Sequence, residues 1–217
     1  MFARGGYTWI LGTLLISAVS LLYYLITNII IFLDLAIILL IFESFLLIFF
    51  RDPERVPKSG PSIMAPADGK VIMISQIPKQ NITRIAIFMN VTNVHVNRAP
   101  LAGRVLIMKH YPGGFSPAYL PEAKQNERLV TQIKTQIGII KIIQIAGLIA
   151  QRIVPYISPG QYLKKGERIG IIQFGSRVDV LLPTDKIRIR ISVGAKVHAG
   201  TSEIAEIKSR NYSFGAV

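Results

Sequence analysis

Ile171-Ile172-Gln173-Phe174-Gly175-Ser176-Arg177-Val178-Asp179-Val180-Leu181-Leu182-Pro183 is the stretch on which the interpretation of this chain depends. It consists of two apolar, strand-like runs that are interrupted by Gly175 and Ser176. Glycine adopts backbone conformations that are closed to other residues, so a bend here can bring the serine oxygen to the carbonyl that precedes it. Taken alone, the pattern is more typical of a strand with a glycine bulge. The remainder of the chain has to decide between these interpretations.

The composition favours a membrane-associated protein. Of the 217 residues, 51% are hydrophobic, and the formal net charge is +13. Basic proteins bind nucleic acids or anionic lipids, but here the basic residues are scattered among Ile and Val, with no Lys/Arg block. The absence of cysteine excludes disulfides and thiolate metal sites. The three histidines are not paired at ligand spacing, so no metal site is predicted.

Residues 1–50 are predicted to form a membrane anchor. The chain is almost wholly apolar from Trp9 to Phe50, which is about twice the ~20 residues that one spanning helix needs. A break at Thr27-Asn28 divides this run into helices near 8–26 and 30–50. Basic residues occur on both flanks and not in the connection: Arg4, Arg51, Arg55 and Lys58. The positive-inside rule then places both ends, and the domain that follows, on the cytoplasmic side of the cell membrane.

Two carboxylates, Asp34 and Glu43, fall inside the second predicted helix. Ionisable groups within a membrane are costly, and they are therefore candidates for a functional role. The alternative is a role in packing the two helices together. The sequence does not choose between them.

Residues 51–62 form a Pro-rich linker, and residues 63–217 are predicted to be a β-rich domain. Short β-branched runs are broken by Gly or Pro every several residues, a pattern typical of a compact β fold. The clearest predicted strands are Lys70–Ile74, Thr83–Phe88, Arg104–Met108 and Ile187–Val193. A helix is plausible only around Pro117–Gln125.

Two internal sequence repeats refine the predicted fold. The run 65–71, Ala-Pro-Ala-Asp-Gly-Lys-Val, recurs at 99–105 as Ala-Pro-Leu-Ala-Gly-Arg-Val. The glycine-bounded turn 160–166 is echoed by 194–200, and both turns resemble those of lipoyl- and biotinyl-type barrel sandwiches. The carrier lysine of such domains is missing, so the repeats indicate a barrel-sandwich-like fold without a carrier function.

Three separated residues have the chemistry of a proton relay. Asp68 lies in an Ala-Pro-Ala-Asp-Gly turn, His95 precedes the second Ala-Pro turn, and Ser176 follows Gly175. In such a relay the histidine removes the serine proton and the aspartate orients the histidine. Individually, a turn aspartate more often bonds its own backbone, and a lone histidine is more often structural.

A glycine loop is a weaker candidate for substrate binding. His110 is followed closely by Gly113 and Gly114, and backbone amides in glycine loops can hold a phosphate. A plain turn is the alternative. His198, in a barrel-type turn, is predicted to be exposed.

Considered in order, these segments resemble the short-form phosphatidylserine decarboxylase proenzymes of bacteria and archaea. The resemblance covers essentially the whole chain. Its motifs are Phe-Phe-Arg-Asp-Pro-Glu-Arg at 49–55, the run 65–71, Asn-Val-His-Val-Asn-Arg-Ala-Pro at 93–100, Tyr-Pro-Gly-Gly-Phe at 111–115, Asn-Glu-Arg at 126–128, Gln-Ile-Ala-Gly-Leu-Ile-Ala at 144–150 and Phe-Gly-Ser at 174–176.

The resemblance implies an enzyme that cleaves itself between Gly175 and Ser176. Ser176 would attack the Gly175 carbonyl, and elimination and hydrolysis would leave a pyruvoyl group on an α chain of residues 176–217, with residues 1–175 as the β chain. This pyruvoyl cofactor would decarboxylate a serine-headgroup phospholipid to the ethanolamine lipid, without a metal. The lipid would be phosphatidylserine or archaetidylserine, and a homodimer remains open.

One departure from the family pattern bears on the catalytic base. Longer members carry a second histidine three residues after the first, whereas this chain has Arg98 there. The resemblance assigns both the processing base and the later proton donor to His95; this departure bears on that assignment and not on Ser176, and His110 is the reserve candidate.

Two other classes of protein compete with this interpretation. A membrane-anchored barrel-sandwich adaptor would explain the anchor and the glycine turns, but not Asp68, His95 and Gly175-Ser176 in this order. A Ser-His-Asp lipid hydrolase would need a serine on a strand-to-helix elbow between glycines. Ser176 is instead followed by Arg177 and a strand-like run, so the decarboxylase is favoured.

Overall fold

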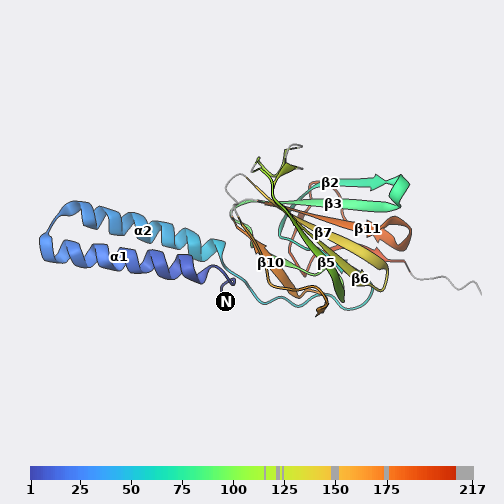
Figure 1. The fold of residues 1–217 in the computed structure, drawn as a ribbon, viewed down its shortest axis with the longest axis horizontal. Helices are drawn as coiled ribbons and strands as arrows, with labels where there is room; N and C mark the ends of the chain where they lie inside the picture. The colour runs from blue at the N-terminus through green and yellow to red at the C-terminus, as the bar shows by residue number, and fades with distance from the viewer. Residues whose placement is uncertain (115, 121–122, 124, 148–151, 174–175, 209–217) are drawn as a thin grey trace, which may run out of the picture.

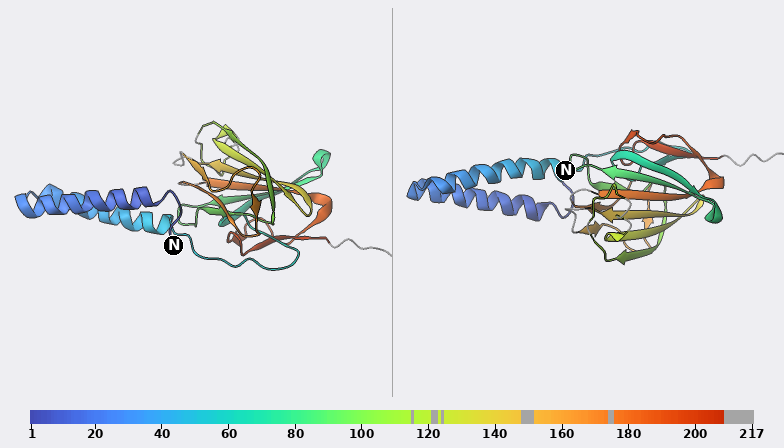
Figure 2. Two further views of the ribbon diagram at one scale, coloured as in Figure 1. Left: turned by 60° about the horizontal axis from the view of Figure 1, so that its bottom comes forward. Right: turned by 90° about the horizontal axis from the view of Figure 1, so that it is seen from above.

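The structure is a computed structural model that describes residues 1–114, 116–120, 123, 125–147, 152–173 and 176–208. A helical hairpin projects from one end of a β domain (Figures 1 and 2). The sequence-based prediction of a mainly β domain behind an N-terminal helical hairpin is confirmed. The region of the predicted helix at 117–125 lies partly outside the described residues.

The hairpin consists of α1 (Tyr7–Thr27) and α2 (Ile30–Phe49). Asn28 ends α1 in the left-handed region (φ 56°), where its N–H bonds the Tyr24 carbonyl. Polar contacts join the helices: the Ser17 hydroxyl donates to the Ala36 carbonyl (3.2 Å) in a buried position, and the Thr13 hydroxyl donates to the Glu43 carboxylate in a partly buried one.

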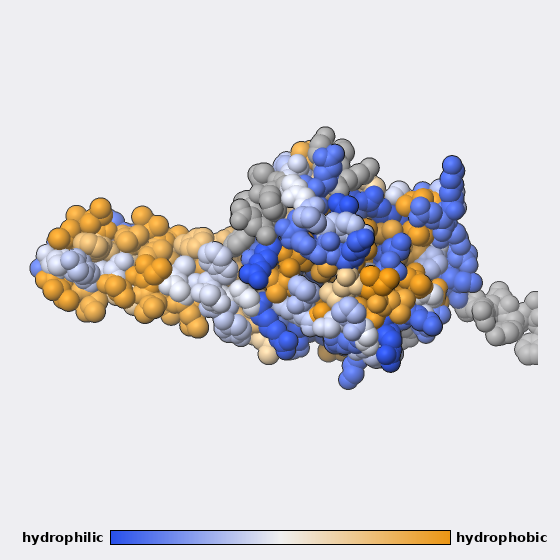
Figure 3. Space-filling model, viewed as in Figure 1, coloured by the Kyte–Doolittle hydropathy of each residue, from blue (hydrophilic) through white to orange (hydrophobic). Residues whose placement is uncertain are grey.

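Apolar side chains cover the outside of the hairpin, in contrast to the mixed surface of the domain (Figure 3). Each helix is apolar enough and long enough to cross a membrane. Most of their side chains have no protein around them. This surface is suited to lipid rather than to water.

The described part of the domain contains three antiparallel sheets, of which the largest has eight strands and curls into a half-barrel (Figure 2). Its strands, in spatial order, are β13 (Lys196–Val197), β2 (Gly69–Ile77), β3 (Ile82–Met89), β11 (Ser176–Pro183), β7 (Gly138–Ala146), β6 (Arg128–Thr135), β5 (Gly103–Tyr111) and β9 (Tyr162–Leu163). A second sheet has the order β4 (Val96–Arg98), β10 (Arg168–Ile172), β8 (Ile153–Pro155). The third has the order β1 (Ser62–Met64), β14 (Glu203–Ile207), β12 (Ile187–Ile189). Short 3-10 turns, η1 (Pro78–Gln80) and η3 (Thr184–Lys186), complete the described elements.

Three of the four named strand predictions coincide with longer strands, β2, β3 and β5. The fourth, Ile187–Val193, is correct only at its start, because β12 ends at Ile189. The chain then turns, and Gly194 adopts a positive φ of 93°. The Ile-rich composition does not reveal this turn.

β11 occupies the middle of the large sheet, with β3 on one side and β7 on the other. Val178, Val180 and Leu182 point into the main core. Arg177 and Asp179 alternate with them and are also buried, so both faces of this strand are covered. The stretch 171–183 thus forms the end of β10 and the whole of β11, with residues 174 and 175 outside the described part.

The internal sequence repeats correspond to a structural pseudo-repeat. The N–H of Gly200 bonds the Ala65 carbonyl (2.8 Å), and the N–H of Gly166 bonds the Ala99 carbonyl (2.8 Å). In the same way, β13 pairs with the start of β2, and β9 pairs with the start of β5. Each Ala-Pro turn is therefore held by one barrel-type turn, once at each edge of the large sheet.

A second apolar cluster joins the hairpin to the domain. It combines residues from the chain start, α1 and the end of α2 with residues from β10, β4 and the segment that leads into β4: Ala3, Ile10, Leu46, Phe49, Phe50, Val94, Val96 and Ile171. The end of α2 is therefore packed against the part of the domain that carries His95.

Candidate functional site

Ser176 is the first residue of β11 and is fully buried. It lies opposite Met89 of β3 and Ala146 of β7. Its hydroxyl donates to the Met89 sulfur (Oγ–Sδ 3.3 Å). A thioether is a weak acceptor, so this bond orients the hydroxyl without holding it strongly. Gly175, the other half of the predicted cleavage site, lies outside the described residues.

His95 is fully buried, and the two nitrogens of its ring differ in environment. Nδ1 lies 2.9 Å from the Asn93 carbonyl oxygen, so it carries the proton and donates. Nε2 is buried and has no hydrogen-bond partner among the described residues. Burial lowers the pKa of His95 to about 4, against a smaller raising effect from the Asn93 carbonyl. The imidazole is therefore neutral at pH 7, with an unused lone pair on Nε2.

Asp68 is buried but is not hydrogen-bonded to His95. It accepts bonds from both terminal nitrogens of Arg55 (Nη2–Oδ2 2.9 Å) and from the Ala199 N–H (2.8 Å), and His198 Nδ1 lies 3.4 Å away. Burial alone would raise the pKa of Asp68, but the bonds from Arg55 and Ala199 outweigh it and leave that pKa below its usual value. His198 is exposed, as expected from its turn.

The three members of the expected relay therefore lie in one domain without hydrogen bonds joining them in the described part of the chain. Asp68 acts on His95 only through charge, slightly raising the pKa of the histidine. The relay remains a prediction that would require the side chains to rearrange. Arg98, at the position of the second family histidine, is held by Asp52 (3.1 Å) and by the Gly166 carbonyl (3.1 Å).

A buried polar chain next to Ser176 was not anticipated from the sequence. Gln144 donates to Asn97 (Nε2–Oδ1 2.8 Å), and Asn97 in turn contacts the Met89 sulfur (3.6 Å) that Ser176 also contacts. Both amides are almost fully buried. They lie within the quoted motifs, and a polar residue on an otherwise apolar strand was the available signal.

Ionic contacts hold β11 from its other face. Asp179 accepts bonds from Arg177 of the same strand (2.6 Å) and from Arg84 of β3 (2.8 Å). Asp179 is fully buried. Buried charges of this kind are tolerated when they are paired and hydrogen-bonded. The sequence did not indicate this pairing.

The glycine loop is connected to the site through Asn126. Gly114 bridges to Asn126, whose side-chain amide donates to the Ala146 carbonyl (2.7 Å), and Ala146 lies opposite Ser176. The Gly114 N–H already donates to the Gln125 carbonyl (3.0 Å), so it is not available to a phosphate. His110 is half exposed and bonds Glu127 (3.0 Å).

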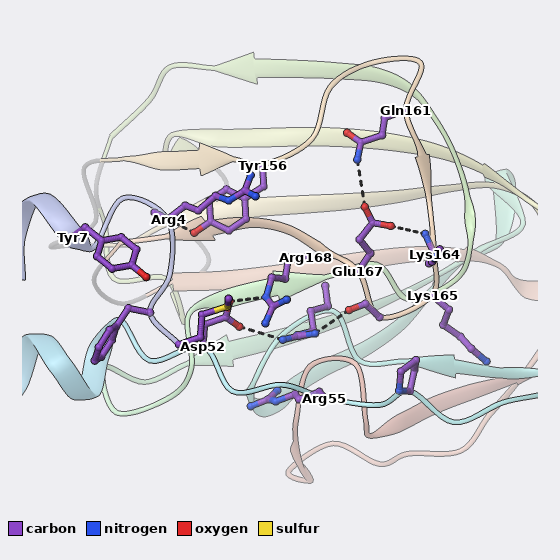
Figure 4. Close-up of a pocket in the computed structure, with 15 residues that line it drawn as sticks. Arg4, Tyr7, Asp52, Arg55, Tyr156, Gln161, Lys164, Lys165, Glu167 and Arg168 are labelled. Atoms are coloured by element: carbon purple, nitrogen blue, oxygen red, sulfur yellow. Dashed lines mark hydrogen bonds and ion pairs between the residues drawn. The ribbon is translucent and has the colours of Figure 1, made fainter.

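Among the described residues, no group of three or more His, Asp or Glu side chains is arranged to hold a metal ion. A large open cavity lies elsewhere, where the start of the chain meets β10 (Figure 4). Neither Ser176 nor His95 lines it.

Comparisons with known proteins agree with the resemblance in the sequence. Residues 42–205 match the family model described as phosphatidylserine decarboxylase. A phosphatidylserine decarboxylase proenzyme of Streptomyces coelicolor is 46% identical over 202 residues, which cover 93% of this chain and 90% of that protein. A protein of Methanococcoides burtonii named "Putative archaetidylserine decarboxylase proenzyme" is 40% identical over 210 residues, covering 96% of this chain and 98% of that protein.

Proposed function

Because the chain belongs to the phosphatidylserine decarboxylase family, we propose that it is a self-processing enzyme that decarboxylates the serine headgroup of a membrane phospholipid. One observation carries the proposal: the buried hydroxyl of Ser176 and the buried, unpaired Nε2 of His95 occur in the same part of the domain. The backbone supports this proximity, since the His95 carbonyl contacts the Ile172 N–H (3.5 Å), four residues before Ser176.

Maturation would begin when the Ser176 hydroxyl adds to the carbonyl carbon of Gly175. The C–N bond would break, and the acyl group would pass from nitrogen to the serine oxygen. Loss of the α proton of residue 176 would then expel the carboxylate of residue 175. Hydrolysis of the remaining enamine would release ammonia and leave a ketone at the start of residues 176–217. The sequence is an N-to-O acyl shift, an elimination and a hydrolysis, so it consumes one water and needs no oxidant or reductant.

His95 is suited to the proton transfers in this sequence. A neutral imidazole at pH 7 can accept a proton at Nε2, and the bond from Nδ1 to Asn93 fixes the tautomer that leaves this lone pair free. After maturation, the same nitrogen can return a proton to the carbon that has lost carbon dioxide. Asn97 and Gln144 would hold the Met89 contact of residue 176 in place.

The fit of a pyruvoyl group rests on the surroundings of Ser176, a buried residue whose hydroxyl bonds a weak sulfur acceptor, and on the buried Nε2 of His95, which has no partner among the described residues. Once formed, this ketone would condense with the headgroup amine and accept the electrons of the departing carboxylate. The headgroup is common to phosphatidylserine and archaetidylserine, so the proposal extends to both lipid classes. The hairpin would hold the domain at the membrane surface, on the cytoplasmic side by the positive-inside rule.

Intact mass under denaturing conditions tests the proposal. The native protein should give two chains split between Gly175 and Ser176, and the smaller chain should begin with a ketone. Ser176→Ala should remain a single chain and form no ethanolamine lipid from serine-lipid vesicles. Ser192→Ala, at an exposed serine of the same segment, is the matched control and should mature normally. A cleaved Ser176→Ala protein would overturn the site assignment.

A second variant addresses His95. In His95→Gln, any protein that has matured should turn over lipid about 10²–10⁴-fold more slowly, the usual contribution of a general acid or base. Rates are normalised to the cleaved fraction measured by mass. Unchanged turnover would remove His95 from the mechanism.

A further inference from the structure

A cavity of about 790 Å³ opens where the anchor joins the domain. Its walls come from the residues before α1, the segment after α2, and the turn that leads into β10, as Figure 4 shows. Ligand sites commonly have volumes of about 300–1,000 Å³. Arg4 just before α1, Tyr7 at the start of α1 and Asp52 after the end of α2 line the cavity, so it lies where the apolar hairpin ends.

Positive charge dominates this cavity. Six cationic side chains line it, against two carboxylates: Arg4, Arg55, Arg98, Lys164, Lys165 and Arg168, with Asp52 and Glu167. Both carboxylates are already engaged. Asp52 accepts bonds from two of these arginines, and Glu167 accepts bonds from the Lys164 N–H (2.7 Å) and from Gln161 (3.3 Å).

The side chains of Arg4 and Lys164 remain uncompensated. Within the described ranges, no carboxylate forms a salt bridge with either of them, and both are exposed. Arg4 lies over the ring of Tyr156 (5.9 Å to the centroid), which places its charge at the cavity wall. Lys165 donates to two carbonyls of the linker instead of a carboxylate, and burial lowers its pKa.

We propose that this cavity binds the phosphodiester of an anionic membrane phospholipid other than the substrate. Unpaired cations beside the end of a membrane anchor match an anionic headgroup in charge and in position, and a cation at the membrane surface contributes about fivefold in affinity. Neither Ser176 nor His95 lines the cavity, so a lipid bound there would not contact these reacting groups. The proposal rests on membrane insertion of the hairpin but does not depend on decarboxylation.

Trp9, the single tryptophan of the chain, allows a direct test. It lies in the first turn of α1, two residues from Tyr7 of the cavity wall, and is half exposed. The full chain is reconstituted into phosphatidylcholine vesicles that contain a small fraction of phosphatidylglycerol with brominated acyl chains. Bromine quenches indole fluorescence on contact. If brominated phosphatidylglycerol quenches Trp9 more than the same fraction of brominated phosphatidylcholine does, phosphatidylglycerol is enriched beside Trp9.

Arg4→Gln combined with Lys164→Gln should abolish the excess quenching by phosphatidylglycerol. The matched control, Lys79→Gln with Arg188→Gln, removes the same charge outside the cavity and should retain it. Excess quenching that survives the cavity substitutions, or disappears equally in the control, overturns the proposal.

Two further arms identify the ligand. If inorganic phosphate abolishes the excess and chloride of equal ionic strength does not, the cavity is a site for soluble phosphate and the proposal fails. It also fails if brominated phosphatidylserine is enriched and phosphatidylglycerol is not, because the cavity then belongs to the substrate. Intact mass of the same samples reports cleavage at Gly175-Ser176, so failure of the proposed function is detected separately.

Discussion

The ring of Phe49, the last residue of α2, lies 4.1 Å from the imidazole of His95, centroid to centroid, at an interplanar angle of 31°. The anchor therefore contributes directly to the environment of the candidate base. This contact helps to exclude water from the imidazole, and exclusion of water is the main cause of its low pKa. The hairpin thus has a chemical effect in addition to any role in holding the domain at a membrane.

Phe49→Ala should raise the pKa of His95 from about 4 toward its ordinary value of 6.5. The truncation opens the imidazole to water, which stabilises the charged form. The measurement is an NMR titration of the ring carbons in detergent, with Ser176→Ala as background to keep a single chain. Only three histidines have to be assigned. Phe42→Ala, on the exposed part of α2, is the control, and an equal shift in both variants would contradict the role given to Phe49.

Stability should rise with pH between about 4 and 6.5. His95 has the lower pKa in the folded chain, so the unfolded chain binds more protons across this window, and protonation favours unfolding. The full effect is up to roughly 3 kcal/mol, which is present above pH 6.5 and lost as the pH falls to 4. Melting temperatures of Ser176→Ala in detergent measure it, and adding His95→Gln should flatten the curve over this window. A slope that persists in the double variant would assign the effect to another group.

Asp68→Asn should lower stability by about 3–5 kcal/mol, because it leaves Arg55 largely buried without its charge partner. Asp185→Asn is the matched control, since that carboxylate pairs with Lys186 at the surface, where such pairs contribute about 0–1 kcal/mol. Melting temperatures of both variants are compared at pH 7. Equal decreases in melting temperature would mean that the buried Asp68–Arg55 pair stabilises the fold no more than a surface pair does.

Gly113→Ala should destabilise the glycine loop, whereas Gly114→Ala should be tolerated. A Cβ at Gly113 would lie 2.2 Å from the Gln125 carbonyl oxygen, but one at Gly114 meets no described atom within 4 Å. Overpacking of this kind costs about 1–3 kcal/mol, which in a chain of this size is roughly 2–4 °C in Tm for each kcal/mol. Slower maturation of Gly113→Ala would further indicate that the loop supports Ser176 through Asn126 and Ala146. A tolerated Gly113→Ala would show that the loop can move aside.

The architecture was largely predictable because it depends on residue type and spacing. The apolar run predicted α1 and α2, and the β-branched runs predicted three of the four named strands and the start of the fourth. The repeated turns indicated the pseudo-repeat, in which Ala65 and Ala99 accept equivalent backbone hydrogen bonds. The partners of the charged groups were not predictable in this way. The cation that reaches Asp68 is Arg55 of the linker, and the path of a linker leaves no periodic pattern in the sequence.

The polar chain of Gln144 and Asn97 illustrates the same limit. Each residue lies in a recognisable motif, but its contact with the other depends on how β4 and β7 approach in space. The unpaired Nε2 of His95 is likewise a property of the packed structure. Sequence patterns therefore predicted candidate groups, and the structure supplied the neighbours of those groups.

The central position of β11 has a consequence for the lifetime of a matured enzyme. A cut before Ser176 leaves this strand bonded along its length to β3 and along most of it to β7, so the two fragments should stay together while folded. After melting, the fragments would diffuse apart, and reassembly would become a second-order reaction that slows on dilution. Heat inactivation of the matured protein would then be effectively one-way, with a half-life set by the rate of unfolding rather than by an equilibrium.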